Sequence, residues 1–306
     1  MKSSSKLPPL PAISTHFFNN TKASTILFSG ISLESGGEYH IPVIPRKGIE
    51  ITMAVLIDPK KNLTAMALGP YEAAMLDAIY TLSVCSCPRI SVEMLVRAMY
   101  GKRDMDVTSK QAEVLRTCLE RLTGITVRID CSAEFTLRKK AAKGEEVIYE
   151  GPLLPLQRCD DGTYVITGTS PVYAYAEAIR QIATVPAEIV QADGLRNNEE
   201  TMLLRRYLLK RIAVMQNTHN HMASNKIALS RWDRKSRSQK GLLPSLYNQA
   251  EYTNWRKKKS KICHSIRAVL AGLQSVEYIA GYKEFMQGRE ITAYQIELEG
   301  GDACGT

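Results

Sequence analysis

The stretch YTNWRKKKSKICHSIRAVLAGLQ, residues 252–274, decides the fold, because its apolar and polar residues recur with a helical period. Projected at about 100° per residue, the apolar residues gather on one side and the basic and polar residues lie opposite them. The apolar side consists of Trp255, Ile262, Ile266, Val269, Leu270 and Leu273. The basic face consists of Arg256, Lys257, Ser260, Lys261, His264 and Arg267. We therefore expect a long helix that packs by one face and carries positive charge on the other.

Positive charge is concentrated around this helix. Residues 201–270 hold sixteen Lys and Arg against two acids, Asp233 and Glu251, a net charge of +14, whereas the whole chain is +9. A local basic patch needs an acidic partner, and duplex nucleic acid is the commonest one. The basic face has no Asp or Glu of its own, which favours a DNA recognition helix. A merely solvated helix face is the alternative.

Further basic residues extend the expected DNA-binding surface. Lys258 and Lys259 project nearer the apolar side and are expected to reach phosphate groups through their long side chains. The preceding loop region adds expected contacts to the DNA backbone from Arg231, Arg234, Lys235, Arg237 and Lys240. Arg289, at the tip of a predicted hairpin, is placed to touch the neighbouring groove. In the first half of the chain, the best phosphate-binding candidates are Arg138, Lys139 and Lys140.

The two halves of the chain show the same order of elements. In the second half, we expect helices at 197–216, 227–232 and 252–274, then strands at 276–282 and 291–298. In the first half, we expect helices from Tyr71, after Ser91 and from Thr108, then strands at 125–129, 147–149 and 164–167. Three helices followed by a hairpin is the winged-helix order. The sequence therefore predicts an α+β fold with two tandem winged-helix-like domains, and a generic α+β fold is the alternative.

The predicted domain organisation has four parts. Residues 1–23, rich in Ser, Asn and Pro, are expected to be a flexible arm. Residues 24–185 are expected to form the first winged-helix-like domain, with a lead-in of strands at 25–28, 39–44 and 49–57. Residues 190–299 are expected to form the second, basic, DNA-binding domain, and residues 300–306 a flexible tail.

The third helix of the first domain differs from its counterpart. Its outward face is mixed in charge and consists of Lys110, Glu113, Arg116, Thr117, Glu120 and Arg121. Such a face suits a polyanion poorly. Homodimerisation and partner docking therefore stand beside DNA contact as expected roles of this domain.

No motif of catalysis or cofactor binding is present in the sequence. It lacks a phosphate-binding G-x-x-x-x-G-K-[ST] loop, a G-x-G-x-x-G, a G-x-S-x-G and an H-E-x-x-H. His219 and His221 fall in a polar turn, and five His in all make acid–base catalysis a poor hypothesis. Cys85 and Cys87 form a lone C-x-C pair, which is a poor zinc site. We expect no enzyme activity, no catalytic residues, no cofactor and no metal.

Composition and hydropathy bound the class of protein. A hydrophobic content of 44% and a charged content of 23% are values of a globular protein. The N-terminal residues break into Pro8, Pro9 and Pro11 before any apolar segment of a signal peptide forms. Uncharged stretches fall short of the roughly 18 apolar residues that a membrane span needs. We expect a soluble, cytoplasmic protein without a membrane partner.

Two stretches carry a resemblance to a known family: YEAAMLDAIYTL, residues 71–82, and RRYLLKRI, residues 205–212. Between about Leu68 and Leu298, the chain resembles the replication initiator proteins of bacterial plasmids and integrative mobile elements that are built from two winged helices in tandem. The resemblance implies that one winged helix dimerises while the other reads repeated origin sequences. It also implies that the basic face of helix 252–274 lies in a major groove, and that a host helicase or polymerase is a partner.

Two alternative functions remain open. A transcriptional regulator could use the same contacts with duplex DNA, on a palindromic target. A structural partner of RNA or of a nucleoprotein would instead require single strands, because the helix docking expected here needs B-form duplex.

Overall fold

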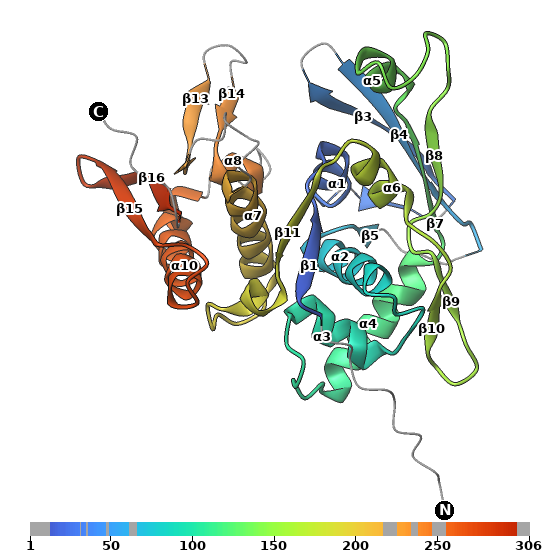
Figure 1. Cartoon of the computed structure of the whole chain (residues 1–306), viewed down its shortest axis with the longest axis horizontal. Coiled ribbons are helices and arrows are strands. Elements are labelled where there is room, and N and C mark those ends of the chain that lie inside the picture. Colours follow the sequence, from blue (N-terminus) through green and yellow to red (C-terminus); the bar gives the residue numbers. More distant parts are fainter. Residues whose placement is uncertain are drawn as a thin grey trace, which may run out of the picture. The chain divides into compact units, whose positions relative to one another are not determined.

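The computed structural model describes residues 13–30, 32–34, 36–46, 49–60, 66–216, 225–233, 238–246 and 255–298. They form helices and several small antiparallel sheets, which confirms the predicted α+β class (Figure 1). The chain divides into two compact units, Met1–Ala187 and Glu188–Thr306.

Three helices of the first unit agree with the sequence prediction. They are α2 (Pro70–Val84), α3 (Val92–Tyr100) and α4 (Ser109–Leu122). The Ser91 side chain caps α3 by accepting a hydrogen bond from the Met94 amide, and Gly101 ends this helix in the left-handed conformation. A capping box between Thr108 and Gln111 starts α4.

A small sheet of the first unit joins a strand between α2 and α3 to two strands that follow α4. Its strands are β6 (Arg89–Ile90), β9 (Leu156–Arg158) and β10 (Tyr164–Ile166), in the order β6-β10-β9. The hairpin partner of β10 is thus β9. The prediction that 147–149 would precede β10 in a hairpin is wrong, because those residues lead into another sheet.

That second sheet has four strands. They are β3 (Glu38–Arg46), β4 (Ile49–Ile57), β7 (Ile125–Asp130) and β8 (Ile148–Pro152), in sequence order across the sheet. The buried side chains of Ile125, Val127 and Ile129 alternate with more exposed ones, as predicted for β7. Of the expected lead-in strands, β4 pairs with β7 and β3 pairs with β4, so both belong to the body of the unit. The short strands β2 (Ser32–Leu33) and β5 (Met66–Ala67) also pair, and helix α5 (Ser132–Leu137) follows β7.

The prediction of a flexible arm over residues 1–23 is wrong from residue 13 onward, and residues 1–12 lie outside the described ranges. Thr15–Asn19 forms β1, which pairs along its length with β11 (Ile182–Pro186). The stretch 25–28, expected to be a strand, belongs mostly to helix α1 (Lys22–Leu27). The reason is local, since the Thr21 hydroxyl accepts a hydrogen bond from the Ser24 amide and caps the helix.

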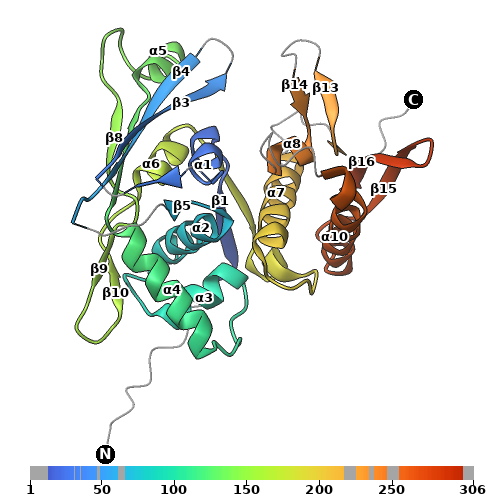
Figure 2. The same cartoon turned by 180° about the vertical axis from the view of Figure 1, so that it is seen from behind.

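A buried polar cluster holds β1 in place. The side chains of Asn19, Asp77 and Tyr173 are buried, and they come from β1, α2 and α6 (Pro171–Ala178) (Figure 2). The Tyr173 hydroxyl donates to Asp77, and the Asn19 side-chain amide donates to the Val172 carbonyl at 2.7 Å. The Asn19 backbone N–H lies 3.1 Å from the Tyr173 oxygen. Buried polar groups are stable only when bonded, so the cluster ties the three elements together.

The described residues of the second unit include helices α7, α8 and α10 and a three-stranded sheet. After the short 3₁₀ segment Ala187–Gln191, its helices are α7 (Glu199–Gln216), α8 (Leu242–Leu246) and α10 (Trp255–Ser275). Its sheet has the order β12-β16-β15, with β12 at Lys226–Ala228, β15 at Gly281–Gln287 and β16 at Glu290–Glu297. A separate hairpin consists of β13 (Arg231–Asp233) and β14 (Ser238–Lys240).

Two predictions about this unit are wrong. Residues 227–232 were expected to be a helix, but they contribute to β12 and β13, because β12 finds a tertiary partner in β16. The strand expected from residue 276 begins at Gly281. Before it, the chain turns back to α10, where the Tyr278 N–H donates to the Leu273 carbonyl, and Glu277 adopts a positive φ of 57°.

In the second unit, α7 and α10 both contact the segment that precedes α7, at Ala192 and Asp193. Arg205 on α7 donates two hydrogen bonds to Asp193, at 2.6 and 2.7 Å, and both side chains are almost fully buried. On α10, a Cβ at Gly272 would lie 2.7 Å from both the Ala192 oxygen and the Asp193 Cα. Only glycine allows α10 to approach this backbone so closely.

We predict that Gly272→Ala lowers the free energy of unfolding by about 1–3 kcal/mol, because the backbone at Ala192 and Asp193 cannot yield as a flexible side chain would. Both tryptophans of the chain, Trp232 and Trp255, lie in the second unit, so urea unfolding followed by tryptophan fluorescence reports the change. In a helix without such a contact, the same substitution stabilises by about 1 kcal/mol. A gain in stability would contradict the close approach.

Candidate nucleic-acid interface

Helix α10 has the two faces that the sequence predicts. Among the described residues, its buried side chains are Ile262, Cys263, Ile266, Val269, Leu270 and Leu273. The exposed side chains opposite are Ser260, Lys261, His264 and Arg267. Arg256 and Lys257 belong to the first turns of α10, and their side chains lie outside the described part of the chain. The amphipathic helix is therefore confirmed for the residues whose side chains are described.

The two lysines expected near the apolar side differ from each other. Lys258 is exposed, whereas Lys259 is partly covered and forms an ion pair with Glu290 at 2.6 Å. Glu290 begins strand β16 directly after the hairpin turn, so this ion pair joins Lys259 to the turn end of the hairpin. Lys258 remains accessible to a phosphate group, while Lys259 already has a carboxylate partner.

Two cations of the basic face form ion pairs with carboxylates from other elements. Arg267 donates to both carboxylate oxygens of Glu284 on β15, at 2.7 and 3.1 Å, and the pair raises the pKa of Arg267. Lys261 lies 3.3 Å from Glu200 on α7. The sequence predicts that the basic face has no acid to pair with, and α10 indeed contains none. In the folded unit this prediction is wrong, because other elements bring carboxylates to the face. The residues Lys258 and His264 form no ion pair with any described residue.

The β15–β16 hairpin extends beside α10 (Figure 1). Its turn contains Gly288, with a φ of 61°, and the exposed Arg289, as the sequence predicts. Phe285 and Met286 are exposed near the tip, and the Lys226 ammonium group lies 3.5 Å from the centre of the Phe285 ring. The tip thus combines apolar and cationic groups.

Two of the remaining candidates of the second unit belong to the β13–β14 hairpin. Arg231 and Lys240 are directly opposite each other in its register, so the pairing brings two basic residues together. The side chains of both residues are outside the described part of the structure, as are Arg234, Lys235 and Arg237.

The candidates of the first unit are mostly engaged within the fold. Arg138 donates two hydrogen bonds to Glu134, at 2.6 and 2.9 Å, and the Glu134 side chain is fully buried. The Tyr175 hydroxyl donates to the other Glu134 oxygen at 2.6 Å, and burial together with this bond raises the pKa of Tyr175. Lys140 donates to the Ala178 carbonyl at 2.6 Å. Arg138 and Lys140 therefore serve the fold, which makes them poor phosphate ligands.

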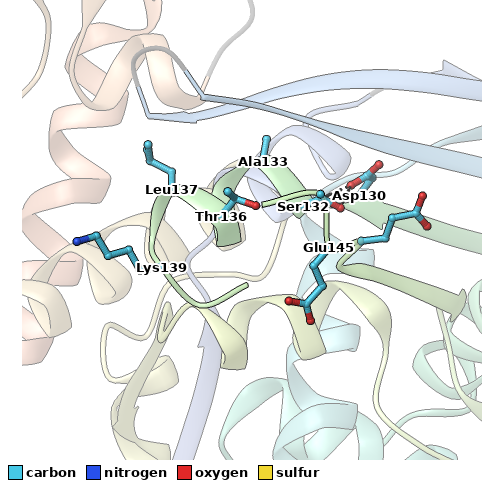
Figure 3. A pocket seen from close by; sticks show the side chains of 9 residues that line it. Asp130, Ser132, Ala133, Thr136, Leu137, Lys139 and Glu145 are labelled. Atoms are coloured by element: carbon cyan, nitrogen blue, oxygen red, sulfur yellow. Dashed lines mark hydrogen bonds between the residues drawn. The ribbon is translucent and has the colours of Figure 1, made fainter. Parts of the chain in front are cut away.

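Lys139 borders an open hollow beside α5. Three carboxylates also line this hollow, from Asp130, Glu145 and Glu146. Figure 3 shows Lys139 at one end, away from Asp130 and Glu145. The negative charge of the lining disfavours a phosphate group.

The mixed-sign face of α4 is also partly neutralised. Arg116 lies 3.9 Å from Glu93 on α3, and Glu120 lies 3.1 Å from Arg158 on β9. Both pairs are exposed and contribute little to stability. They leave this face without the excess of positive charge that α10 carries.

The described residues also bear on metal binding, thiol reactivity and membrane-spanning helices. None of their His, Cys, Asp and Glu side chains form a group of three that could hold a metal ion. Burial raises the pKa of the Cys85 and Cys87 thiols, which keeps them protonated. Within the same ranges, every helix is too short or too polar to span a lipid bilayer.

Among known proteins, the chain is similar to solved structures, while no protein-family model and no curated protein matches its sequence. A selenomethionine derivative of domain 2 and domain 3 of RctB matches with 13% identity and a TM-score of 0.49, over 89% of this chain and 94% of that one. A second structure of RctB domains 2–3 matches with 10% identity and a TM-score of 0.44, over 90% and 95% of the two chains. At these values, conclusions about function rest on the residues of this chain.

We predict that Arg138→Gln lowers the free energy of unfolding by about 3–5 kcal/mol, because it leaves the buried Glu134 carboxylate without its cation. Circular dichroism during urea unfolding measures the loss. Lys139→Gln is the matched control, since it removes the same charge from an exposed neighbour and is expected to leave stability within about 0.5 kcal/mol. Equal stability of the two variants would contradict the structural role of Arg138.

Proposed function

We propose that this protein binds duplex DNA through α10 and the β15–β16 hairpin of its second unit. The observation that carries the proposal is the exposed basic face of α10 on a helix whose opposite face is fully buried. A helix held in this way can enter the major groove, which is about 12 Å wide and admits an α-helix. The hairpin would then reach the sugar–phosphate backbone or the neighbouring groove with Arg289.

The topology supports a winged-helix-like interpretation of both units. In the first unit, the short strand β6 precedes α3 and pairs with β10, the last strand of the β9–β10 hairpin. In the second unit, the short strand β12 precedes α8 and pairs with β16, the last strand of the β15–β16 hairpin. Both arrangements place a third helix, α4 or α10, before a hairpin. We propose that the two units are related modules that present this helix and hairpin differently.

The electrostatics separate the roles of the two units. The region 201–270 has a net charge of +14, so neutralising DNA phosphates would release counterions and make binding strongly salt-dependent. The α4 face of the first unit is instead mixed and ion-paired. We propose that the first unit mediates homodimerisation or docks a partner while the second binds DNA.

For the biological role, we propose the initiation of replication of a bacterial plasmid or integrative mobile element, without catalysis, in the cytoplasm. This role rests on the sequence resemblance and requires directly repeated binding sites, together with a helicase or polymerase partner. A transcriptional regulator is the second candidate, and a palindromic target would favour it. A preference for single strands would favour a role in an RNA or nucleoprotein assembly.

We predict that Lys258→Gln combined with Lys261→Gln weakens duplex DNA binding and lowers the slope of log affinity against log salt by about 0.9–1.8, because the phosphate contact of Lys258 is lost in full and that of Lys261, which Glu200 also engages, in part. Fluorescence anisotropy with labelled duplex at several salt concentrations measures both. Lys102→Gln combined with Lys143→Gln removes the same charge from exposed positions of the first unit and is the control. The proposed interface is wrong if both double variants bind as the unsubstituted protein does.

A further inference from the structure

Three carboxylates from three different elements hold three cations of α10. Glu284 on β15 binds Arg267, Glu290 on β16 binds Lys259, and Glu200 on α7 binds Lys261. The helix itself carries no acid between residues 255 and 275. The fold therefore brings acidic groups to the margins of a face that the helix sequence alone makes wholly basic.

The pair between Arg267 and Glu284 is the best defined of the three. The guanidinium group uses two N–H donors on the two oxygens of one carboxylate, which is the geometry that it also offers to a phosphate group. Glu284 lies opposite the buried Tyr294 in the hairpin register, and the Glu284 side chain is only 28% exposed. A phosphate group that binds Arg267 must displace or share this carboxylate.

We propose that Glu284 competes with DNA phosphate groups for Arg267 and thereby lowers the affinity of the α10 face for duplex DNA. This inference rests on the proposed function, since it concerns the same interface. Because the cost applies to every duplex, it lowers the affinity for arbitrary and target DNA alike and sets the overall strength of binding at this interface.

The structural alternative makes the opposite prediction. If Glu284 only fastens the hairpin to α10, its removal loosens Arg267 and the hairpin, and DNA binding weakens or stays the same. If Glu284 competes with phosphate, its removal tightens binding to arbitrary DNA although stability falls slightly. Affinity and stability measured on one variant therefore distinguish the two roles.

The test compares Glu284→Gln with Glu277→Gln in the full chain. Glu277 is exposed in the turn before β15, so its substitution makes the same change in net charge away from Arg267. Against a mixed-sequence duplex, we expect Glu284→Gln to bind roughly two- to fivefold more tightly than Glu277→Gln. We also expect its salt slope to be steeper by about 0.9, as one additional phosphate contact requires.

Two further variants make the test decisive. In an Arg267→Gln background, Glu284→Gln is expected to have no effect beyond that of Glu277→Gln, because the cation that it would release is absent. If Glu284→Gln does not fold, Glu290→Gln tests the same effect through Lys259, and its side chain is 73% exposed. Equal binding by the Glu284 and Glu277 variants, or an unchanged gain without Arg267, overturns the inference. Failure of the unsubstituted protein to bind duplex overturns the proposed function, and the inference with it.

Discussion

The close contact between α10 and the chain before α7 is the constraint on which the second unit depends. Gly272 brings α10 against the backbone of Ala192 and Asp193, and the buried pair of Asp193 with Arg205 ties that backbone to α7. A helix fixed at such short range cannot rotate about its axis. Its apolar side chains must then face the core, and Ser260, Lys261, His264 and Arg267 must face the solvent. The orientation of the candidate interface follows from this contact.

Helical period and capping residues predicted much of the fold. The apolar period gave α2 and α10, Ser91 and Thr108 gave the starts of α3 and α4, and the alternation at 125–129 gave β7. Apart from α1, which a local cap begins, two of the failed predictions depend on distant partners. Strand β12 exists because β16 pairs with it, and β1 is ordered because β11 pairs with it and Asn19 bonds to elements about 60 and 150 residues away. A single sequence carries no local signal of such pairings.

In the candidate site, too, local features could be predicted from the sequence and tertiary contacts could not. The basic face of α10 was predictable, since the helix period and the residue types lie within one segment. The acidic partners were not, because Glu200, Glu284 and Glu290 reach the face only through the packing of α7 and the hairpin. In the first unit, the sequence places Arg138 in a charged loop. The structure instead shows it as the ion-pair partner of the buried Glu134. Tertiary ion pairs thus decide which cations of a basic segment can meet a polyanion.

The central claim is that the second unit binds B-form duplex DNA through α10. The most direct measurement titrates the full chain against labelled duplex DNA, single-stranded DNA and duplex RNA, each at two salt concentrations. The account predicts the tightest binding to duplex DNA, with a slope of log affinity against log salt of roughly −5 for about six neutralised phosphates. Preference for single strands or duplex RNA, or no binding to any of the three at low salt, would contradict it.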